Sequence, residues 1–285
     1  MNADLSSGFA QPLISRLQRC CSQAGCYPVL GLQAPVGAGK STLARQLQDL
    51  ATTVGLRLAV ASIDDAYHGW AERQRRLAGN PFGVNRVPPG SHDPELLVAA
   101  ITAWREGGLL TVPRFDKTLR QGQGDRNGWQ RWSDADALLL EGWLVGYQPV
   151  GEARLSRWLA DHPEELNAAE QAWLHRWDQA LADYQALWQC CDSFWMLQPE
   201  RTSSVLRWRL QAEARQRRRG GQVLSSREIQ ALVRASQASL PAGLYGPALE
   251  ARAMGIARLD GRRRCRQVTL NQASLSSSLM GYTKP

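Results

Sequence analysis

Short apolar runs alternate along the chain with longer stretches whose apolar residues recur at helical spacing. Residues 27–34 form one such run. After a glycine-containing loop, residues 41–53 carry leucines at positions 43, 47 and 50. This spacing of three to four residues places the leucines on one face of a helix. Residues 56–63 are apolar again and end in two aspartates. The order predicts strand, loop, helix and strand, which is the βαβ unit of a parallel sheet.

Three more apolar runs predict strands at residues 109–115, 137–140 and 192–197. The middle run is followed by Glu141 and Gly142, which is typical of a central parallel strand with an acidic residue at its tip. We therefore expect a carboxylate at the edge of the sheet, where open α/β sheets bind their ligands.

Near the end of the chain, residues 255–259 and 263–270 flank Asp260 and Gly261. An Asp-Gly pair between two strands favours a two-residue type I′ turn. The sequence therefore predicts a small antiparallel hairpin at this end of the fold.

Helices are predicted between the strands. Pro94 in a first turn and Asp93 as its cap indicate a helix over residues 94–104. Residues 202–219 form another helix, which becomes densely basic before two glycines end it. One or two long helices cover residues 152–190, where we interpret the regularly spaced tryptophans as core residues.

Two segments carry turn-forming residues instead of a periodic pattern. Residues 69–93 contain three prolines and several glycines, which predicts an irregular loop long enough to be functional. Residues 116–131 are polar and glycine-rich, and no regular element is predicted there.

Composition limits the choice of partners only a little. The formal net charge of +8 comes largely from arginine, and it suits polyphosphates, carboxylates and nucleic acids equally well. The longest apolar runs are far shorter than the roughly 20 residues that span a bilayer. Residues 1–12 lack the basic start and apolar core of a secretory signal. We therefore expect a cytoplasmic protein without a membrane partner.

The strongest chemical signal is the segment Ala34-Pro35-Val36-Gly37-Ala38-Gly39-Lys40-Ser41, which fits the phosphate-binding loop (P-loop) with alanine in place of its first glycine. In such a loop, backbone N–H groups face phosphate oxygens, a lysine reaches the β and γ phosphates, and a hydroxyl binds Mg²⁺. The loop leaves a predicted strand and opens a predicted helix, so we predict nucleotide binding. The residues predicted to bind the nucleotide are Pro35, Val36, Gly37, Ala38, Gly39, Lys40, Ser41 and Thr42.

With 285 residues, of which 44% are hydrophobic, the chain can bury a full core. The elements and the loop together predict an α/β fold of the P-loop NTPase type, with an open, mainly parallel sheet flanked by helices and a small C-terminal hairpin. We expect a single domain over residues 1–285. Its core should cover about residues 27–270, between a flexible N-terminal segment and a C-terminal tail.

Acidic residues stand at two predicted strand ends. Asp64 follows the run 56–63, where its carboxylate can take a proton from a substrate hydroxyl. Asp65 is equally placed to cap a helix start, so a structural role is its alternative. Glu141, on another strand, is the natural acid to hold Mg²⁺ together with Ser41, and an ordinary strand-end acid is its alternative.

A cluster of charges follows the strand predicted at residues 109–115. Its cations suit a small carboxylate substrate, while a solvated loop is the alternative. A single loop histidine, His92, is compatible with either a substrate contact or ordinary polar surface. The residues predicted to line the substrate site are Asp65, Tyr67, His92, Arg114, Asp116, Lys117 and Arg126.

The helix predicted at residues 202–219 carries Arg207, Arg209, Arg215 and Arg217. It could close over a triphosphate, where arginines neutralise the charge that develops during phosphoryl transfer. A basic solvated helix or a nucleic-acid-binding stripe would show the same pattern. The arginines alone favour none of these.

Together the motifs resemble the D-glycerate 3-kinase family, a branch of the P-loop kinases that includes uridine kinase, phosphoribulokinase and bacterial pantothenate kinase. The resemblance extends from about residue 30 to residue 215. Its blocks are residues 32–42, Ser62-Ile63-Asp64-Asp65, Gly90-Ser91-His92-Asp93, Pro113-Arg114-Phe115-Asp116-Lys117 with Gly124-Asp125-Arg126, Glu141-Gly142-Trp143, and Trp208-Arg209-Leu210-Gln211-Ala212-Glu213.

The resemblance implies an ATP-dependent kinase with Mg²⁺ that phosphorylates a small anionic metabolite, D-glycerate, to give 3-phosphoglycerate. It implies that Asp64 activates the acceptor hydroxyl and that Glu141 assists Mg²⁺. Lys40 and Arg209 are then the expected catalytic cations that stabilise the transferring phosphoryl group.

Two positions depart from the family pattern. Phe115 stands where the family usually has tyrosine, and Ala66 replaces an aromatic residue before Tyr67. A missing phenolic hydroxyl can alter how a polar substrate is held. The departures therefore bear on the acceptor more than on the reaction.

Two alternatives remain open at this point. A kinase of the same group could act on pantothenate, a nucleoside or another hydroxy acid, and a panel of acceptors separates these. The chain could also be an NTP-dependent nucleic-acid-binding or assembly factor, which the net charge and the arginines of residues 215–219 would support. Aromatic residues are not interleaved with these arginines, so we do not expect nucleic acid as the partner.

Overall fold

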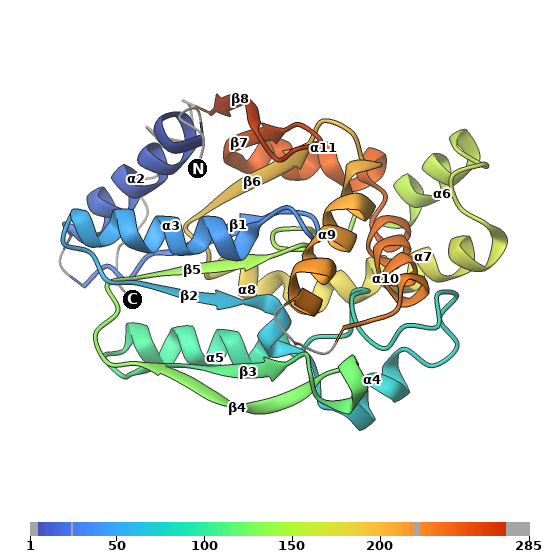
Figure 1. Cartoon of the computed structure of the whole chain (residues 1–285), viewed down its shortest axis with the longest axis horizontal. Coiled ribbons are helices and arrows are strands. Elements are labelled where there is room, and N and C mark those ends of the chain that lie inside the picture. The colour runs from blue at the N-terminus through green and yellow to red at the C-terminus, as the bar shows by residue number, and fades with distance from the viewer. Residues whose placement is uncertain (1–4, 24, 219–222, 272–285) are drawn as a thin grey trace.

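The computed structural model describes residues 5–23, 25–218 and 223–271, and its centre is a six-stranded sheet (Figure 1). The strand order is β2-β5-β1-β6-β7-β8, in which the first five strands are parallel and β8 runs antiparallel to β7. In that order the strands are Leu58–Ser62, Ala137–Gly142, Val29–Gln33, Ser193–Pro199, Ala253–Leu259 and Cys265–Leu270. The predicted α/β fold, mainly parallel with a C-terminal hairpin, is therefore confirmed.

Strand β5 shows why helices have to cover both faces of this sheet. All six of its residues are buried. Leu138 and Leu140 belong to the core on one face and Leu139 to the core on the other, because successive side chains of a strand point to opposite sides. A strand buried on both faces is apolar nearly throughout, and this is the pattern that predicted it.

Helices pack on each face as the apolar spacing requires. Helix α3 (Lys40–Thr53) uses Leu43 and Leu47 on one face. The opposite face is covered by α5 (Pro94–Arg105), α8 (Gln185–Gln189) and α11 (Ala242–Arg252). The helices predicted at residues 41–53 and 94–104 are confirmed, whereas α11 was not predicted.

The N-terminal segment corrects the predicted boundary of the core. A π-helical turn, η1 (Ser6–Ala10), runs into helix α2 (Gln11–Cys21), which lies beside α3 (Figure 1). Phe9 and Leu17 are fully buried, and the Phe9 ring packs edge-on against Trp195 with centroids 5.3 Å apart. The prediction of a flexible N-terminal segment is therefore wrong for residues 5–21. The predicted C-terminal tail lies outside the described residues from position 272 onward.

The chain between β2 and β5 builds a second, two-stranded antiparallel sheet from β3 (Leu110–Asp116) and β4 (Asp125–Trp132). No strand was predicted at β4, because all of its side chains are exposed or half-buried and no apolar alternation marks it. Helix α4 (Trp70–Arg76) likewise forms inside residues 69–93, where the sequence predicted only irregular chain. Both β4 and α4 are stabilised by contacts with residues that are distant in the sequence.

The remaining helices gather beyond the carboxyl ends of the parallel strands (Figure 1). They are α6 (Glu152–Asp161), α7 (Ala168–Ala180), α9 (Ser204–Arg218) and α10 (Ser226–Ser239). Residues 152–190 form α6, α7, a 3₁₀ turn η4 (Leu181–Tyr184) and α8 instead of one or two long helices. Trp158, Trp177 and Trp188 are 7%, 1% and 2% exposed, which confirms that they are core residues, whereas Trp173 is half-buried at the edge of the core. No helix in the described part of the chain is long and apolar enough to cross a membrane.

The hairpin of β7 and β8 is present, but its turn differs from the prediction. Neither Asp260 nor Gly261 has the positive φ angle that a type I′ turn needs, and Arg263 adopts a left-handed φ of 62° instead. The Asp260 Oδ1 atom accepts the backbone N–H groups of Arg262 and Arg264 at 2.8 and 2.9 Å. This carboxylate therefore organises a longer loop, which reaches toward the P-loop.

Because Leu17 is fully buried, Leu17→Ala should lower the free energy of unfolding by about 2–5 kcal/mol, through lost burial and the cavity left behind. Gln18 is the exposed neighbour on the same helix, and Gln18→Ala should change the free energy of unfolding by less than about 0.5 kcal/mol. Urea denaturation followed by circular dichroism measures both. Equal stability of the two variants would show that α2 does not belong to the cooperative core.

Candidate active site

The P-loop joins β1 to α3. Gly39, with φ of 100°, is the N-cap of α3. It has no side chain that could accept hydrogen bonds from the first N–H groups of the helix, so these groups are open to an anion. The Lys40 Nζ atom donates to the carbonyls of Ala34 and Pro35 at 3.2 and 3.4 Å. The side chains of Ser41 and Thr42 are exposed. The geometry is that of a phosphate cradle, as the motif predicts.

Helix α9 lies directly against this loop. A Cβ atom on Gly37 would come within 2.6 Å of the Arg209 backbone nitrogen, so only glycine fits. Val36 packs against Val205 of α9. Arg263, from the loop between β7 and β8, donates to the carbonyl oxygens of Gly37 and Trp208 at 2.8 and 2.9 Å. The P-loop is therefore held between α9 and the C-terminal hairpin.

Arg209 lies beside the P-loop through its backbone, as the predicted catalytic role requires. Its Nη1 atom forms an ion pair with Glu213, one helical turn later, at 2.5 Å. Glu213 is buried and also accepts the backbone N–H of Leu224 at 2.7 Å. The carboxylate thus holds the Arg209 guanidinium against α9, one turn from the residue whose backbone meets the loop.

Asp64 occupies the 3₁₀ turn η2 (Ile63–Ala66) that follows β2. Its Oδ2 atom accepts Lys117 Nζ at 2.7 Å, and its Oδ1 atom lies 3.7 Å from His92 Nε2. Burial acts to raise the pKa of Asp64, but the Lys117 ammonium and the His92 ring outweigh it and hold this pKa well below its ordinary value. The carboxylate is therefore ionised at neutral pH.

His92 is a buried part of this centre and not a surface residue, which decides between its two interpretations. Its Nδ1 atom is 2.9 Å from the Tyr184 hydroxyl, and its ring stacks on Tyr67 at 4.2 Å. The Tyr184 oxygen already accepts the Gly90 N–H at 3.1 Å, so its own proton is free for Nδ1. Burial lowers the pKa of His92, so the ring is neutral and carries its proton on Nε2, facing Asp64.

Glu141 reaches the same place from β5. Its Oε2 atom lies 4.0 Å from Lys40 Nζ and is buried without a hydrogen-bond partner. Burial raises the pKa of Glu141 against the opposing effect of Lys40. A buried carboxylate oxygen beside the P-loop fits the acid that accompanies Mg²⁺ in phosphoryl-transfer sites.

Several residues predicted for the substrate have structural contacts instead. Asp65 accepts the Ser62 and Phe115 N–H groups at 3.4 and 3.1 Å, which is the capping role left open for it. Arg126 donates to Asp93 and to the Tyr67 carbonyl.

The remaining predicted substrate cations and acid lie toward solvent or next to Asp64. Asp116 is bound to Thr118, Arg114 is exposed, and Lys117 pairs with Asp64. Asp93 makes no side-chain cap for α5, contrary to the prediction, because it pairs with Arg126.

Sequence reasoning missed two buried arginines beside Tyr67. Arg73 is fully buried, donates to the Gly124 carbonyl at 2.6 Å, and holds its guanidinium 4.7 Å from the Phe115 ring. Arg86 is 6% exposed and donates at 3.4 Å to the Gln123 carbonyl. Both lie in the stretch predicted to be an irregular loop, where composition gives no signal of burial.

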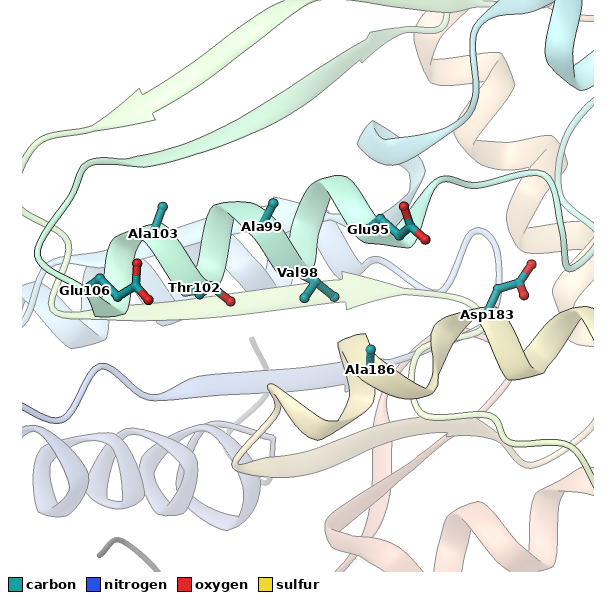
Figure 2. Close-up of a pocket in the computed structure, with 8 residues that line it drawn as sticks. All are labelled: Glu95, Val98, Ala99, Thr102, Ala103, Glu106, Asp183 and Ala186. Atoms are coloured by element: carbon teal, nitrogen blue, oxygen red, sulfur yellow. The ribbon is translucent and has the colours of Figure 1, made fainter. Parts of the chain in front are cut away.

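Two concave regions lie outside this centre. A groove of about 420 Å³ runs between α5 and the η4–α8 segment (Figure 2) and contains none of the predicted site residues. A cavity of about 820 Å³ lies at the carboxyl ends of β1 and β6, next to Pro35, and is closed by α10 and α11. Neither contains Asp64 or Lys40.

Comparisons with known proteins agree with this geometry. No family model matches the chain. It is 32% identical over 212 residues to the chloroplastic D-glycerate 3-kinase of Arabidopsis thaliana, covering 70% of this chain and 44% of that protein. It is 31% identical over 211 residues to an uncharacterized kinase of Schizosaccharomyces pombe, covering 70% of this chain and 75% of the relative. The chain thus spans less than half the length of the plant relative.

Among solved structures, the fold is similar to that of D-glycerate 3-kinase from Cryptococcus neoformans var. grubii. The TM-score is 0.79 at 25% sequence identity, covering 92% of this chain and 97% of that chain. The similarity therefore includes nearly all of the elements described above.

The contact between Gly37 and α9 gives a testable prediction. Gly37→Ala should weaken ATP binding at least about tenfold, because its φ of 78° is unfavourable for alanine and the new Cβ collides with α9. Isothermal titration with a non-hydrolysable ATP analogue measures the effect. Gly243→Ala is the control, since its Cβ meets nothing nearer than 3.7 Å. Unchanged affinity in Gly37→Ala would mean that α9 moves off the loop when nucleotide binds.

Proposed function

Because the chain belongs to the D-glycerate 3-kinase family of P-loop kinases, we propose that it transfers the γ-phosphoryl group of ATP to a hydroxyl of a small anionic metabolite. The acceptor we propose is D-glycerate, and the product is 3-phosphoglycerate. The observation that supports this best is Asp64, an ionised carboxylate with a buried, unpartnered oxygen two strands away from the P-loop.

ATP is held, in this proposal, by residues 35–42. The open N–H groups at the start of α3 face its phosphates, and Lys40 turns from its loop carbonyls to the β and γ oxygens. Arg209 adds positive charge from α9. When bound, Mg²⁺ neutralises charge on the phosphates, and Ser41 and Glu141 are the residues that would hold it.

The acceptor hydroxyl donates its hydrogen bond to Oδ1 of Asp64, the oxygen that Lys117 does not bind. As the hydroxyl oxygen forms its bond to the γ phosphorus, the bond from that phosphorus to the β,γ-bridging oxygen breaks, ADP leaves, and the proton passes to Asp64. A carboxylate with a lowered pKa is a weak base, so it mainly orients the hydroxyl and takes the proton late. This suits a transition state in which little bonding to the nucleophile has formed.

His92 and Lys117 act by holding this carboxylate. Lys117 donates to Oδ2, and the Nε2 proton of His92 faces Oδ1. The His92 ring is itself held by stacking on the Tyr67 ring. The hydrogen bond from Tyr184 fixes the tautomer of His92. The arrangement keeps Asp64 ionised in a poorly solvated place.

The reaction is tested by measuring ADP release from ATP and Mg²⁺ with D-glycerate, L-glycerate, pantothenate, uridine or no acceptor. We expect turnover with D-glycerate that falls at least about 100-fold in Asp64→Asn, because the base and hydroxyl-orienting group is lost. ATP affinity should stay within a factor of three in the variant. Turnover on a different acceptor would support the kinase function but replace D-glycerate as the proposed acceptor. Equal turnover with no acceptor would argue against phosphoryl transfer to a metabolite.

The ion pair of Asp64 with Lys117 predicts a change in pH dependence. Lys117→Met removes the cation that lowers the pKa of Asp64, while burial continues to raise it. Activity is lost as pH falls through this pKa, so the acid limb of kcat/KM should move upward by about 1–3 pH units. Lys117→Arg keeps the charge and should keep the acid limb. A uniformly lower profile without a shift would show that Lys117 contacts substrate and does not tune Asp64.

A further inference from the structure

Arg86 is a buried cation that the protein leaves without a counter-charge. Its side chain belongs to the segment between α4 and α5 and is 6% exposed. Among the described residues, its guanidinium makes one hydrogen bond, from Nη1 to the Gln123 carbonyl at 3.4 Å. No carboxylate oxygen of the described residues lies within 4.0 Å of the Arg86 guanidinium. A guanidinium has five N–H donors, so most of its donor capacity is unused.

Contacts of Arg86 place it between two sides of the site. Its partner Gln123 is followed by Gly124, whose carbonyl accepts from Arg73, and the Arg73 guanidinium lies 5.8 Å from the centroid of the Tyr67 ring. The Gln123 side chain donates to Glu228, at the start of α10, at 3.1 Å. Arg86 therefore lies between the residues around Tyr67 and the start of α10.

The carboxylates of this region already have other partners, and Glu228 accepts from Ser225 and Gln123. Asp64 is paired with Lys117 and Glu213 with Arg209. Arg73 is fully buried with its guanidinium over the Tyr67 and Phe115 rings, where it adds further positive potential. Its Nε and Nη1 atoms have no hydrogen-bond partner in the described part of the chain. Buried charges are normally paired, and an unpaired one in a ligand site indicates that the ligand supplies the counter-ion.

We propose that Arg86 is the receptor for the carboxylate of the acceptor, which it binds in a bidentate manner while the acceptor hydroxyl faces Asp64. The proposal deepens the kinase function and rests on it. A planar guanidinium matches a carboxylate in geometry as well as charge. Arg86 takes the place of the three cations predicted from the sequence. Arg114 is exposed, Lys117 is paired with Asp64 and Arg126 is paired with Asp93.

A carboxylate fits this position better than the γ phosphate does. The phosphates already have Lys40, the N–H groups of α3 and Arg209, which all belong to the P-loop side. Arg86 is joined through Gln123 and Gly124 to Arg73, which lies beside Tyr67 on the acceptor side. In the proposal, a small hydroxy acid meets Arg86 with its carboxylate and Asp64 with its hydroxyl.

The test compares D-glycerate with the neutral amide of D-glyceric acid in the wild type, in Arg86→Gln and in the exposed control Arg75→Gln. We expect Arg86→Gln to raise the KM for D-glycerate about 100-fold and to leave the KM for ATP within a factor of three. The wild-type preference for the acid over the amide should largely disappear in Arg86→Gln. Arg75→Gln should match the wild type in all three measurements.

A melting experiment separates lost recognition from lost folding. Since Arg86 is buried and unpaired, ligand-free Arg86→Gln should melt at or above the wild-type temperature. D-glycerate added with ADP and Mg²⁺ should raise the melting temperature of the wild type but not of Arg86→Gln. A variant that melts lower and still shows the full shift with D-glycerate would overturn the proposal.

The outcomes distinguish this proposal from the function on which it rests. An unchanged KM for D-glycerate in Arg86→Gln, or an equal loss for acid, amide and ATP, overturns the role of Arg86 and leaves the kinase. Wild-type turnover on another hydroxy acid replaces D-glycerate, and the same acid-to-amide ratio then decides the role of Arg86. A wild type that neither phosphorylates nor binds any hydroxy acid overturns both.

Discussion

Parallel pairing of β5 with β1 on one side and β2 on the other sets Glu141 opposite Leu32 and Ser62. The three strands therefore end at one level, and the segments that leave them meet at one edge of the sheet. After β1 comes the P-loop, whose Ala34 N–H still bonds to the Gly142 carbonyl at 3.1 Å. After β2 comes Asp64. A slip of one residue in β5 would turn Glu141 into the opposite face and separate these groups.

On this fixed edge, the charge of the site is arranged by residues from elsewhere in the chain. Lys117 comes from the end of β3, and the small antiparallel sheet is attached to η2 by the bond from the Phe115 N–H to Asp65. Arg209 is placed by the contact of α9 with Gly37. The cations outnumber the acids that can neutralise them, which stabilises anionic ligands at the expense of the ligand-free protein.

The parts of the site that local pattern encodes could be predicted from the sequence. Lys40, Ser41, Asp64 and Glu141 each follow an apolar run that marks a buried strand, so their place at one edge follows from the general behaviour of parallel sheets. The P-loop motif and the chemistry of strand-end acids indicated their roles, and the family resemblance agrees with them. The N-terminal helix was within reach of the same reasoning, because Leu5, Phe9, Leu13 and Leu17 recur every four residues.

The other errors have a common physical origin in pairing between distant residues. Strand β4 exists because it pairs with β3, and its own side chains carry no apolar alternation. Arg126 was predicted to be a cation that binds substrate, but it forms an ion pair with Asp93 at 3.0 Å. Arg86 is likewise buried where it meets Gln123, a residue 37 positions further along the chain. No local sequence pattern indicates such contacts. The predicted substrate cations were therefore those that lie close to a strand end in the sequence.

This division explains why the reaction is more closely determined by the sequence than the acceptor is. The groups proposed to bind phosphate and Mg²⁺ from the P-loop and from Glu141 lie at or directly after strands whose register is set by burial on both faces. The groups that face the acceptor lie on loops and on the two-stranded sheet. There, Phe115 packs against Tyr67 at 5.0 Å and under Arg73, and a Cβ on Gly124 would lie 2.2 Å from the Phe115 ring. A substitution at such a packed position can shift the arginines and the aspartate relative to each other without disturbing the P-loop. Acceptor preference can therefore diverge among relatives that share the same phosphoryl-transfer chemistry.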